Sequence, residues 1–215
     1  MTTRQFGIVV PQEQELFYVE VPTGIYAGVW GVDRYLARRP SGIFVPCKEG
    51  LTRIQTYDAL QNDPALLEAG FGLVPAPVLL YGIHHDTNFH KMLRGTYQLT
   101  GSGVVEKDSR YHLGTPNVTR GDLQYEGLRN DRPIARIEPQ SGRVRRLDKT
   151  TLWGIGEDSI VEFEEPTHLI YMYNDDGNRF IDLDVRSFGD VLANAYRHPL
   201  SRGSGGGARL AKRVE

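Results

Sequence analysis

Cysteine and long apolar runs are the two features that this 215-residue chain has least of. Cys47 is the single cysteine, so the chain can form no internal disulfide, which excludes the disulfide-rich secreted proteins. The longest apolar stretch, residues 70–83, is interrupted by two prolines and is too short to span a bilayer. The N-terminal residues also lack the apolar core of a signal peptide. We therefore expect a soluble protein with no membrane partner, which is made in the cytoplasm and kept in a reducing compartment.

Net charge is small, but charge is unevenly distributed along the chain. The formal net charge of −2 gives no overall attraction to nucleic acid or to anionic membranes. Residues 129–149 carry seven basic and three acidic side chains, whereas residues 155–184 carry one basic and nine acidic side chains. Residues 197–215 carry five basic side chains and one acidic side chain. These blocks predict complementary patches that join copies of the chain head to tail, or join it to a partner. The alternative is a set of solvated hairpin faces.

The content of glycine, proline and tyrosine favours a fold built from short strands and tight turns. The chain has 24 glycines, 12 prolines and 11 tyrosines. Three pairs of apolar segments are expected to form hairpins, because turn-forming residues separate them at 86–88, 140–142 and 174–178. This pattern predicts a meander or sandwich of mostly antiparallel strands. Further strands are expected at residues 6–10, 15–21, 24–30 and 42–46.

Two helices are expected to pack on these strands. Residues 63–69 begin with Asp63 as N-cap and Pro64 at the first helical position. Residues 187–197 place apolar side chains at helical spacing on one face. The sequence therefore predicts an α+β, β-rich fold, in which a mostly antiparallel sheet or sandwich built from hairpins carries one or two packed helices.

The domain organisation is expected to be simple. A single globular domain is predicted for residues 1–199, with a soft internal boundary near residues 72–78, where glycine and proline gather. Residues 200–215 are rich in glycine and carry an excess of basic side chains, which predicts a flexible C-terminal arm. Such an arm has the charge needed to contact nucleic acid phosphates or an acidic neighbour.

Three of the six histidines fall within residues 84–90, in the stretch GIHHDTNFHKML. If Asp86 to Asn88 form a hairpin turn, His84 and His90 face each other across two strands, with Cβ atoms about 5 Å apart. That spacing suits a metal ion, although a third ligand must come from elsewhere in the chain. The alternative is an ordinary polar turn, because Asp, Thr and Asn are common turn residues.

A second candidate site is formed by Arg94, Ser102 and the pair Glu162 and Glu164. In their order along the chain these residues resemble the arginine, serine and glutamate-x-glutamate pattern of the ADP-ribosyltransferases. The resemblance implies that Arg94 holds the phosphates of NAD, that Ser102 supports the nicotinamide pocket, and that Glu164 stabilises the transition state. The Ser-Thr-Ser motif of that family is absent here. The alternative is an exposed acidic strand face.

Several familiar catalytic motifs are absent, including the nucleophile elbow, the zinc-protease motif and paired cysteines. The leading hypothesis is therefore a structural protein, without cofactor, that acts in an assembly as a homo-oligomer or beside neighbouring subunits. A bacteriophage virion or tail component, made in the cytoplasm and carried in the virion, is a concrete case. An enzyme of ADP-ribosyltransferase type and a small metal-binding module are the alternatives. The expected interface residues are Arg143, Arg145, Arg146, Glu162, Glu164, Glu165, Arg209, Lys212 and Arg213.

Overall fold

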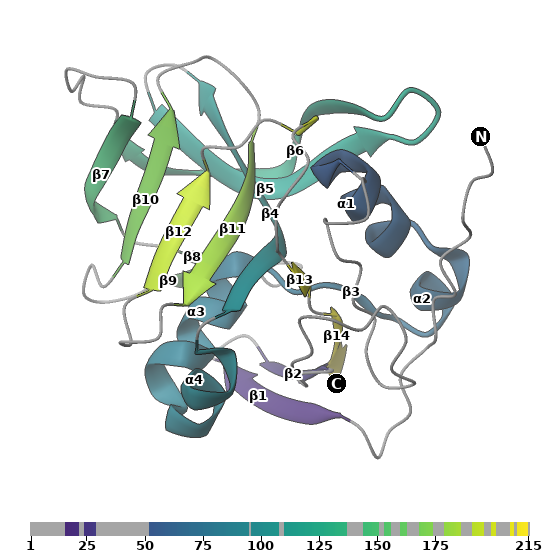
Figure 1. The fold of residues 1–215 in the computed structure, drawn as a ribbon, viewed down its shortest axis with the longest axis vertical. Helices are drawn as coiled ribbons and strands as arrows, with labels where there is room; N and C mark the ends of the chain where they lie inside the picture. Colours follow the sequence, from purple (N-terminus) through teal and green to yellow (C-terminus); the bar gives the residue numbers. More distant parts are fainter. Residues whose placement is uncertain are drawn as a thin grey trace.

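The computed structural model describes the chain in segments, and most of the described residues belong to strands or helices (Figure 1). The strands predicted at residues 6–10 and 42–46 lie outside these segments, as does Cys47. The described residues are 16–21, 24–28, 52–94, 96–107, 110–136, 144–150, 153–155, 160–162, 168–173, 179–185, 191–195, 199–200, 207–208 and 210–214.

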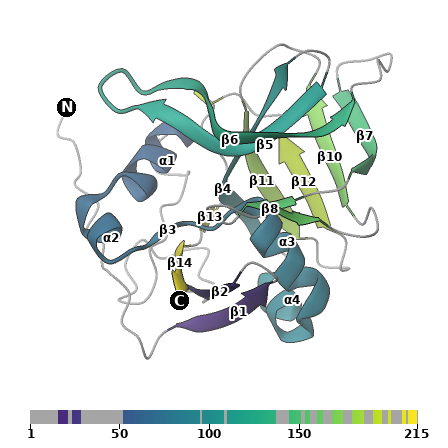
Figure 2. The ribbon, with the colours of Figure 1, turned by 180° about the vertical axis from the view of Figure 1, so that it is seen from behind.

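The larger of the two main sheets has eight strands and curves strongly (Figures 1 and 2). Its strands are β4 (Thr96–Lys107), β5 (Arg110–Thr119), β6 (Gln124–Arg136), β7 (Val144–Thr150), β10 (His168–Tyr173), β11 (Arg179–Val185), β12 (Val191–Ala195) and β13 (Gly207–Ala208). They run in the order β6-β5-β4-β11-β12-β10-β7, and β13 pairs with β4 beside this series. Neighbours are antiparallel except for two parallel pairs, β10 with β12 and β13 with β4. A separate ladder pairs β8 (Trp153–Ile155) with β9 (Ile160–Glu162).

The smaller sheet brings together segments that lie far apart in the sequence. It consists of β1 (Phe17–Val21), β2 (Gly24–Gly28), β3 (Gly72–Leu73) and β14 (Leu210–Val214). The order is β1-β2-β14-β3, so β14 lies between the N-terminal hairpin and β3. The strands predicted at residues 15–21 and 24–30 are confirmed where these segments are described.

Strand β14 corrects the prediction that residues 200–215 form a flexible arm. Leu210 is 1% exposed and Ala211 is 7% exposed, and the strand pairs with β2 on one side and with β3 on the other. Glycine dominates the composition of this part of the sequence, so the short apolar pattern that follows it is easily overlooked. The division of the chain at residue 199 stays a prediction.

Four short helices lie within the described residues: α1 (Arg53–Gln61), α2 (Pro64–Glu68), α3 (Ala76–His85) and α4 (Thr87–Leu93). Helix α2 confirms the helix predicted at residues 63–69. Asp63 is its N-cap, and Oδ1 of this side chain accepts two backbone hydrogen bonds from the first turn. Helix α1 is not predicted from the sequence, although a capping box between Thr52 and Gln55 begins it.

The hairpin predicted around residues 86–88 is wrong, because two helices meet there. Helices α3 and α4 join at Asp86, which ends the first helix and caps the second. Leu79, Leu80 and Ile83 are all buried, so this apolar run enters the core from a helix and not from a strand. A short apolar run does not by its periodicity distinguish a buried strand from a buried helix.

Three further sequence predictions fail around strand β12 and at the ends of the larger sheet. The helix expected at residues 187–197 is wrong, because Val191–Ala195 is a strand. The hairpin expected around residues 174–178 is also wrong: both of its strands exist, as β10 and β11, but β12 lies between them. The strands expected to pair around residues 140–142 are β6 and β7, which lie at opposite ends of the sheet. In each case pairing with distant strands outweighs the local preference of the segment.

Two clusters of buried apolar side chains form the core. Strand β11 contributes to both, with Ile181 and Leu183 packing in the cluster of α3 and α4, and Phe180 packing in the cluster of α1. The predicted α+β, β-rich and mostly antiparallel fold class is confirmed. In the part of the chain that the structure describes, no helix has the length and apolar character needed to cross a membrane.

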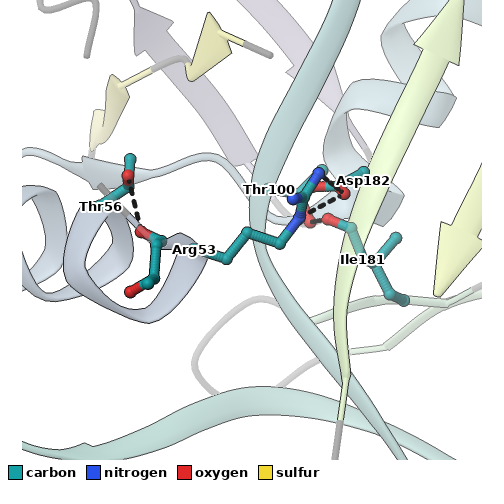
Figure 3. Close-up of polar contacts among 6 residues, drawn as sticks. Arg53, Thr56, Thr100, Ile181 and Asp182 are labelled. Carbon is teal, nitrogen blue, oxygen red and sulfur yellow. Dashed lines mark hydrogen bonds and ion pairs between the residues drawn. The ribbon is translucent and has the colours of Figure 1, made fainter. Parts of the chain in front are cut away.

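A buried ion pair ties helix α1 to the larger sheet (Figure 3). Arg53, the first residue of α1, donates from Nε to Oδ2 of Asp182 in β11 at 2.9 Å, and its Nη2 lies 2.7 Å from the same oxygen. Both side chains are 2% exposed. Nearby, the hydroxyl of Thr100 in β4 donates to the carbonyl oxygen of Ile181 at 2.7 Å. The ion pair therefore fixes the first turn of α1 against β11.

We expect Arg53→Met to lower the free energy of unfolding by about 3–5 kcal/mol, because the Asp182 carboxylate stays buried without its cation. Adding Asp182→Leu should recover most of the loss, since apolar side chains then replace both charges. A pair with an exposed arginine is the control: Arg120 Nε lies 3.9 Å from Asp58 Oδ2, and Arg120→Ala should cost less than about 1 kcal/mol. Chemical denaturation measures all three, and equal losses at the two sites would contradict this account.

Two tyrosines pack around Phe180 in the cluster of α1. The ring centroids of Tyr57 and Tyr125 lie 4.9 Å and 5.2 Å from that of Phe180. Tyr57 donates from its hydroxyl to the carbonyl oxygen of Pro116 at 3.1 Å. Burial raises the pKa of both tyrosines well above the usual value. The positive charge of Arg129 lowers the pKa of Tyr57 and so offsets part of its rise. The nearby Tyr57 raises the pKa of Tyr125 further.

These pKa shifts predict a loss of stability in alkali. The unfolded chain ionises its tyrosines at about pH 10, whereas the folded chain keeps Tyr57 and Tyr125 protonated there. The free energy of unfolding should therefore fall as pH rises above about 10. Tyr57→Phe should reduce this dependence on pH, although it also loses the bond to Pro116 at neutral pH. Tyr18→Phe, at an exposed ring, is the control. Urea denaturation on both sides of pH 10 measures the effect, and an unchanged slope in Tyr57→Phe would argue against it.

Candidate functional site

A groove of about 530 Å³ lies between strand β1 and the corner where α3 meets α4. Its volume falls in the range of about 300–1,000 Å³ that is usual for ligand pockets. Residues 18–20 of β1 line one side, and Gly82, His85 and residues 86–88 line the rest. Two separate parts of the fold therefore build this site.

Strand β1 forms the first wall with its outer edge. It is the end strand of the smaller sheet, and among the described residues it pairs only with β2. Three consecutive residues, Tyr18 to Glu20, line the groove, although neighbouring side chains in a strand point to opposite faces. The groove therefore runs along the backbone edge of the strand. Figures 1 and 2 both place β1 at the outside of the molecule, next to α4.

Asp86 builds the second wall, because it ends α3 and caps α4. Its Oδ1 accepts hydrogen bonds from the backbone N–H groups of Asn88 at 2.8 Å and of Phe89 at 3.0 Å. In the last turn of α3, the Tyr81 ring packs on the ring of His85, with centroids 4.0 Å apart. The cap fixes the start of α4 at the corner between the two helices, and the ring contact lies within α3.

Gly82 lets the two walls approach each other closely. A Cβ atom at this position would lie 2.8 Å from the Phe89 ring and 3.0 Å from Cγ1 of Val19. Phe89 is fully buried and Val19 is 3% exposed, so neither side chain has space to move away. A larger residue at position 82 would therefore push β1 away from α3 and change the width of the groove.

Acidic side chains give the groove its chemical preference. Glu20 is exposed on β1 and Asp86 stands on the opposite wall, whereas the described residues that line the groove include no lysine or arginine. The groove therefore favours a ligand that carries cationic groups and that also offers backbone hydrogen-bonding groups to β1.

The histidines predicted as metal ligands do not face each other across a hairpin. His84 lies in α3 and His90 lies in α4, so the cross-strand geometry on which that prediction depends does not exist. Among the residues that the structure describes, no group of three or more His, Cys, Asp or Glu side chains could hold a metal ion. The described residues therefore give the metal-binding hypothesis no support.

The residues that resemble an ADP-ribosyltransferase site are not brought together within the described segments. Ser102 is 3% exposed, and its Oγ accepts a hydrogen bond from the backbone N–H of Ala76 at 2.9 Å. This bond anchors the start of α3, whose N-cap is Pro75. Arg94 is exposed at the end of α4, and Glu164 lies outside the described residues. The hydroxyl of Ser102 is therefore already used to position α3.

The predicted interface residues are spread over different sheets. Arg145 and Arg146 are neighbours on β7, and Glu162 ends β9. Lys212 and Arg213 lie on β14, inside the smaller sheet. The Nζ atom of Lys212 lies over the buried ring of Phe71, 5.5 Å from the ring centroid, so Lys212 does not belong to a mobile arm. Outside the described residues are Arg143, Glu164, Glu165 and Arg209.

The groove itself is not predicted from the sequence, because it forms only where two distant segments meet. The one local signal is the polar run HHDTN at residues 84–88, directly after an apolar segment. We interpret that run as a turn between strands, which gives the correct polarity but the wrong structure. No signal in the sequence indicates that β1 lies beside it.

Comparison with known proteins adds no family to these observations: no family model, no curated protein and no solved structure matches this chain. The function of the groove is therefore inferred from its geometry and its charge.

We expect Asp86→Ala to lower the free energy of unfolding by about 1 kcal/mol, because the first turn of α4 loses the acceptor for two backbone N–H groups. Asp86→Asn keeps an acceptor oxygen at this position and should retain most of the stability. Urea denaturation of the wild type and both variants measures the difference. Equal stability of Asp86→Ala and the wild type would show that the corner does not depend on this cap.

Proposed function

We propose that the protein is a structural protein that acts in an assembly, through contacts with other copies of the chain, and that the groove beside β1 is a contact site. The observation that supports this proposal is the edge of β1, which among the described residues carries no further strand and faces a groove. An extended segment in the groove can hydrogen-bond to the backbone of β1, while the walls contact its side chains. Such a site is suited to binding a polypeptide.

The composition of β1 adds support. Edge strands are usually protected by charged residues, by proline or by a covering segment, because their free backbone groups attract other strands. Of the five residues Phe17–Val21, only Glu20 is charged, and Tyr18 is 54% exposed. Ile25, which is opposite Glu20 on β2, is 39% exposed. An edge with this composition is better suited to a bound partner than to water.

A bacteriophage virion or tail component is the concrete case that we propose, made in the cytoplasm and then carried in the virion. The opposed charge blocks of the sequence support an assembly in which complementary charges join the copies. Such contacts weaken as salt is added, because the Debye length falls to about 8 Å at physiological ionic strength. Neither the metal-binding nor the enzymatic alternative gains an observation from the described residues, so neither is proposed.

If the groove is a contact site, then filling it should prevent self-association. We expect the wild-type chain to have a mass above that of the monomer in light scattering, and we expect Asn88→Trp to remain monomeric because the indole occupies the groove. The substitution keeps the cap of α4, since the backbone N–H of Asn88, and not its side chain, bonds to Asp86.

Glu68→Trp is the matched control for this experiment. Glu68 is exposed on α2, which lies on the opposite side of the molecule from α4 (Figure 1). This variant should associate like the wild type. A wild-type chain that stays monomeric at every concentration, or Asn88→Trp oligomers of normal mass, would contradict the proposed function.

A further inference from the structure

Strand β7 is a second end strand, and its charge is complementary to that of the groove. It closes one end of the larger sheet, and among the described residues it pairs only with β10. The strand VRRLDKT has three basic residues and one acidic residue, whereas the lining of the groove includes Glu20 and Asp86. The chain therefore carries an acidic groove beside one strand edge and a basic strand at another.

We propose that the groove of one copy receives strand β7 of a second copy, which adds to the edge of β1. This inference rests on the proposed function and names the segment that fills the groove. Main-chain hydrogen bonds between the two strands hold the contact together, and the opposite charges select this pairing among others.

The two adjacent arginines of β7 fit the groove in either strand direction. Residues 18–20 span roughly 7 Å at about 3.3 Å per residue, so about three residues of the incoming strand lie along the groove. Because side chains alternate between faces, either Arg145 or Arg146 of the second copy shares the face of Glu20. The other arginine shares the face of Val19, which packs against α3.

Charge disfavours the other pairings of these two edges. Two β1 edges would bring two acidic grooves together, and two β7 edges would bring arginines together. Like charges that are directly opposite in a sheet are destabilising. The β1–β7 contact uses different surfaces on the two copies, so repeating it builds a ring or an open chain and not a closed pair.

Charge reversal on each side, followed by mixing, tests this pairing. Glu20→Lys makes the groove edge basic, and Arg145→Glu with Arg146→Glu makes β7 acidic. Each variant alone should self-associate about tenfold more weakly than the wild type, because like charges then meet at the contact. An equimolar mixture restores opposite charges at every contact and should return the dissociation constant to within about threefold of the wild type. Analytical ultracentrifugation of the full chains measures these constants.

Matched controls reverse charge at exposed residues away from the groove. Glu68→Lys and Arg120→Glu should leave association unchanged, alone or mixed. Circular dichroism checks the fold of each variant, and Arg146→Glu alone replaces the double variant if that protein does not fold.

The outcomes separate this inference from the function on which it rests. A mixture of folded variants that associates as weakly as its components overturns the β1–β7 pairing. If Asn88→Trp abolishes association but charge reversal leaves it unchanged, the groove is a contact site and β7 is not the segment that fills it. A wild-type chain that remains monomeric overturns both proposals.

Discussion

The pairing of β14 with two strands at once holds the walls of the groove together. On one side β14 pairs with β2, whose other neighbour is β1. On its other side it pairs with β3, which leads after two residues into α3. Just before β14, strand β13 pairs with β4, so residues 207–214 join the smaller sheet to the larger one. An isolated two-stranded hairpin is at best marginally stable in water, so the β1–β2 hairpin depends on this connection.

Strand β4 then sets where α3 begins. The backbone N–H of Gly101 donates to the carbonyl oxygen of Val74 at 2.8 Å, and Oγ of Ser102 accepts from the N–H of Ala76 at 2.9 Å. A Cβ atom at Gly101 would collide with the carbonyl oxygen of Leu73, so the close approach of these segments requires glycine. Ser102 belongs to the set of residues whose order along the chain resembles the ADP-ribosyltransferase pattern. In the structure, however, its hydroxyl anchors the start of α3. The anchor and the cap at Asp86 together define the helical wall of the groove.

What the sequence predicts well is local. Helix α2 has its N-cap and first-turn proline at Asp63 and Pro64, and the β1–β2 hairpin has its turn between two strand patterns; both are recognisable because neighbouring residues determine them. Residues 187–197 look helical by spacing, because Phe188, Val191, Leu192 and Ala195 recur at i, i+3, i+4 and i+7. The contacts that decide the structure of β12 are those with β10 and β11. The groove depends on contacts between Val19 and Gly82, which are far apart in the sequence. No composition or periodicity contains that information.

The position of β14 also determines when, during synthesis of the chain, the groove can form. The strands β1 and β2 leave the ribosome long before residues 210–214 are made, and pairing between such distant segments is slow because a long loop must close first. During that interval the edge of β1 is exposed on a hairpin that is not yet supported, which is the condition under which nascent chains aggregate. Only when β14 inserts between β2 and β3 do the two walls face each other. Completion of the smaller sheet, and with it of the groove, therefore waits until residues 210–214 have been made.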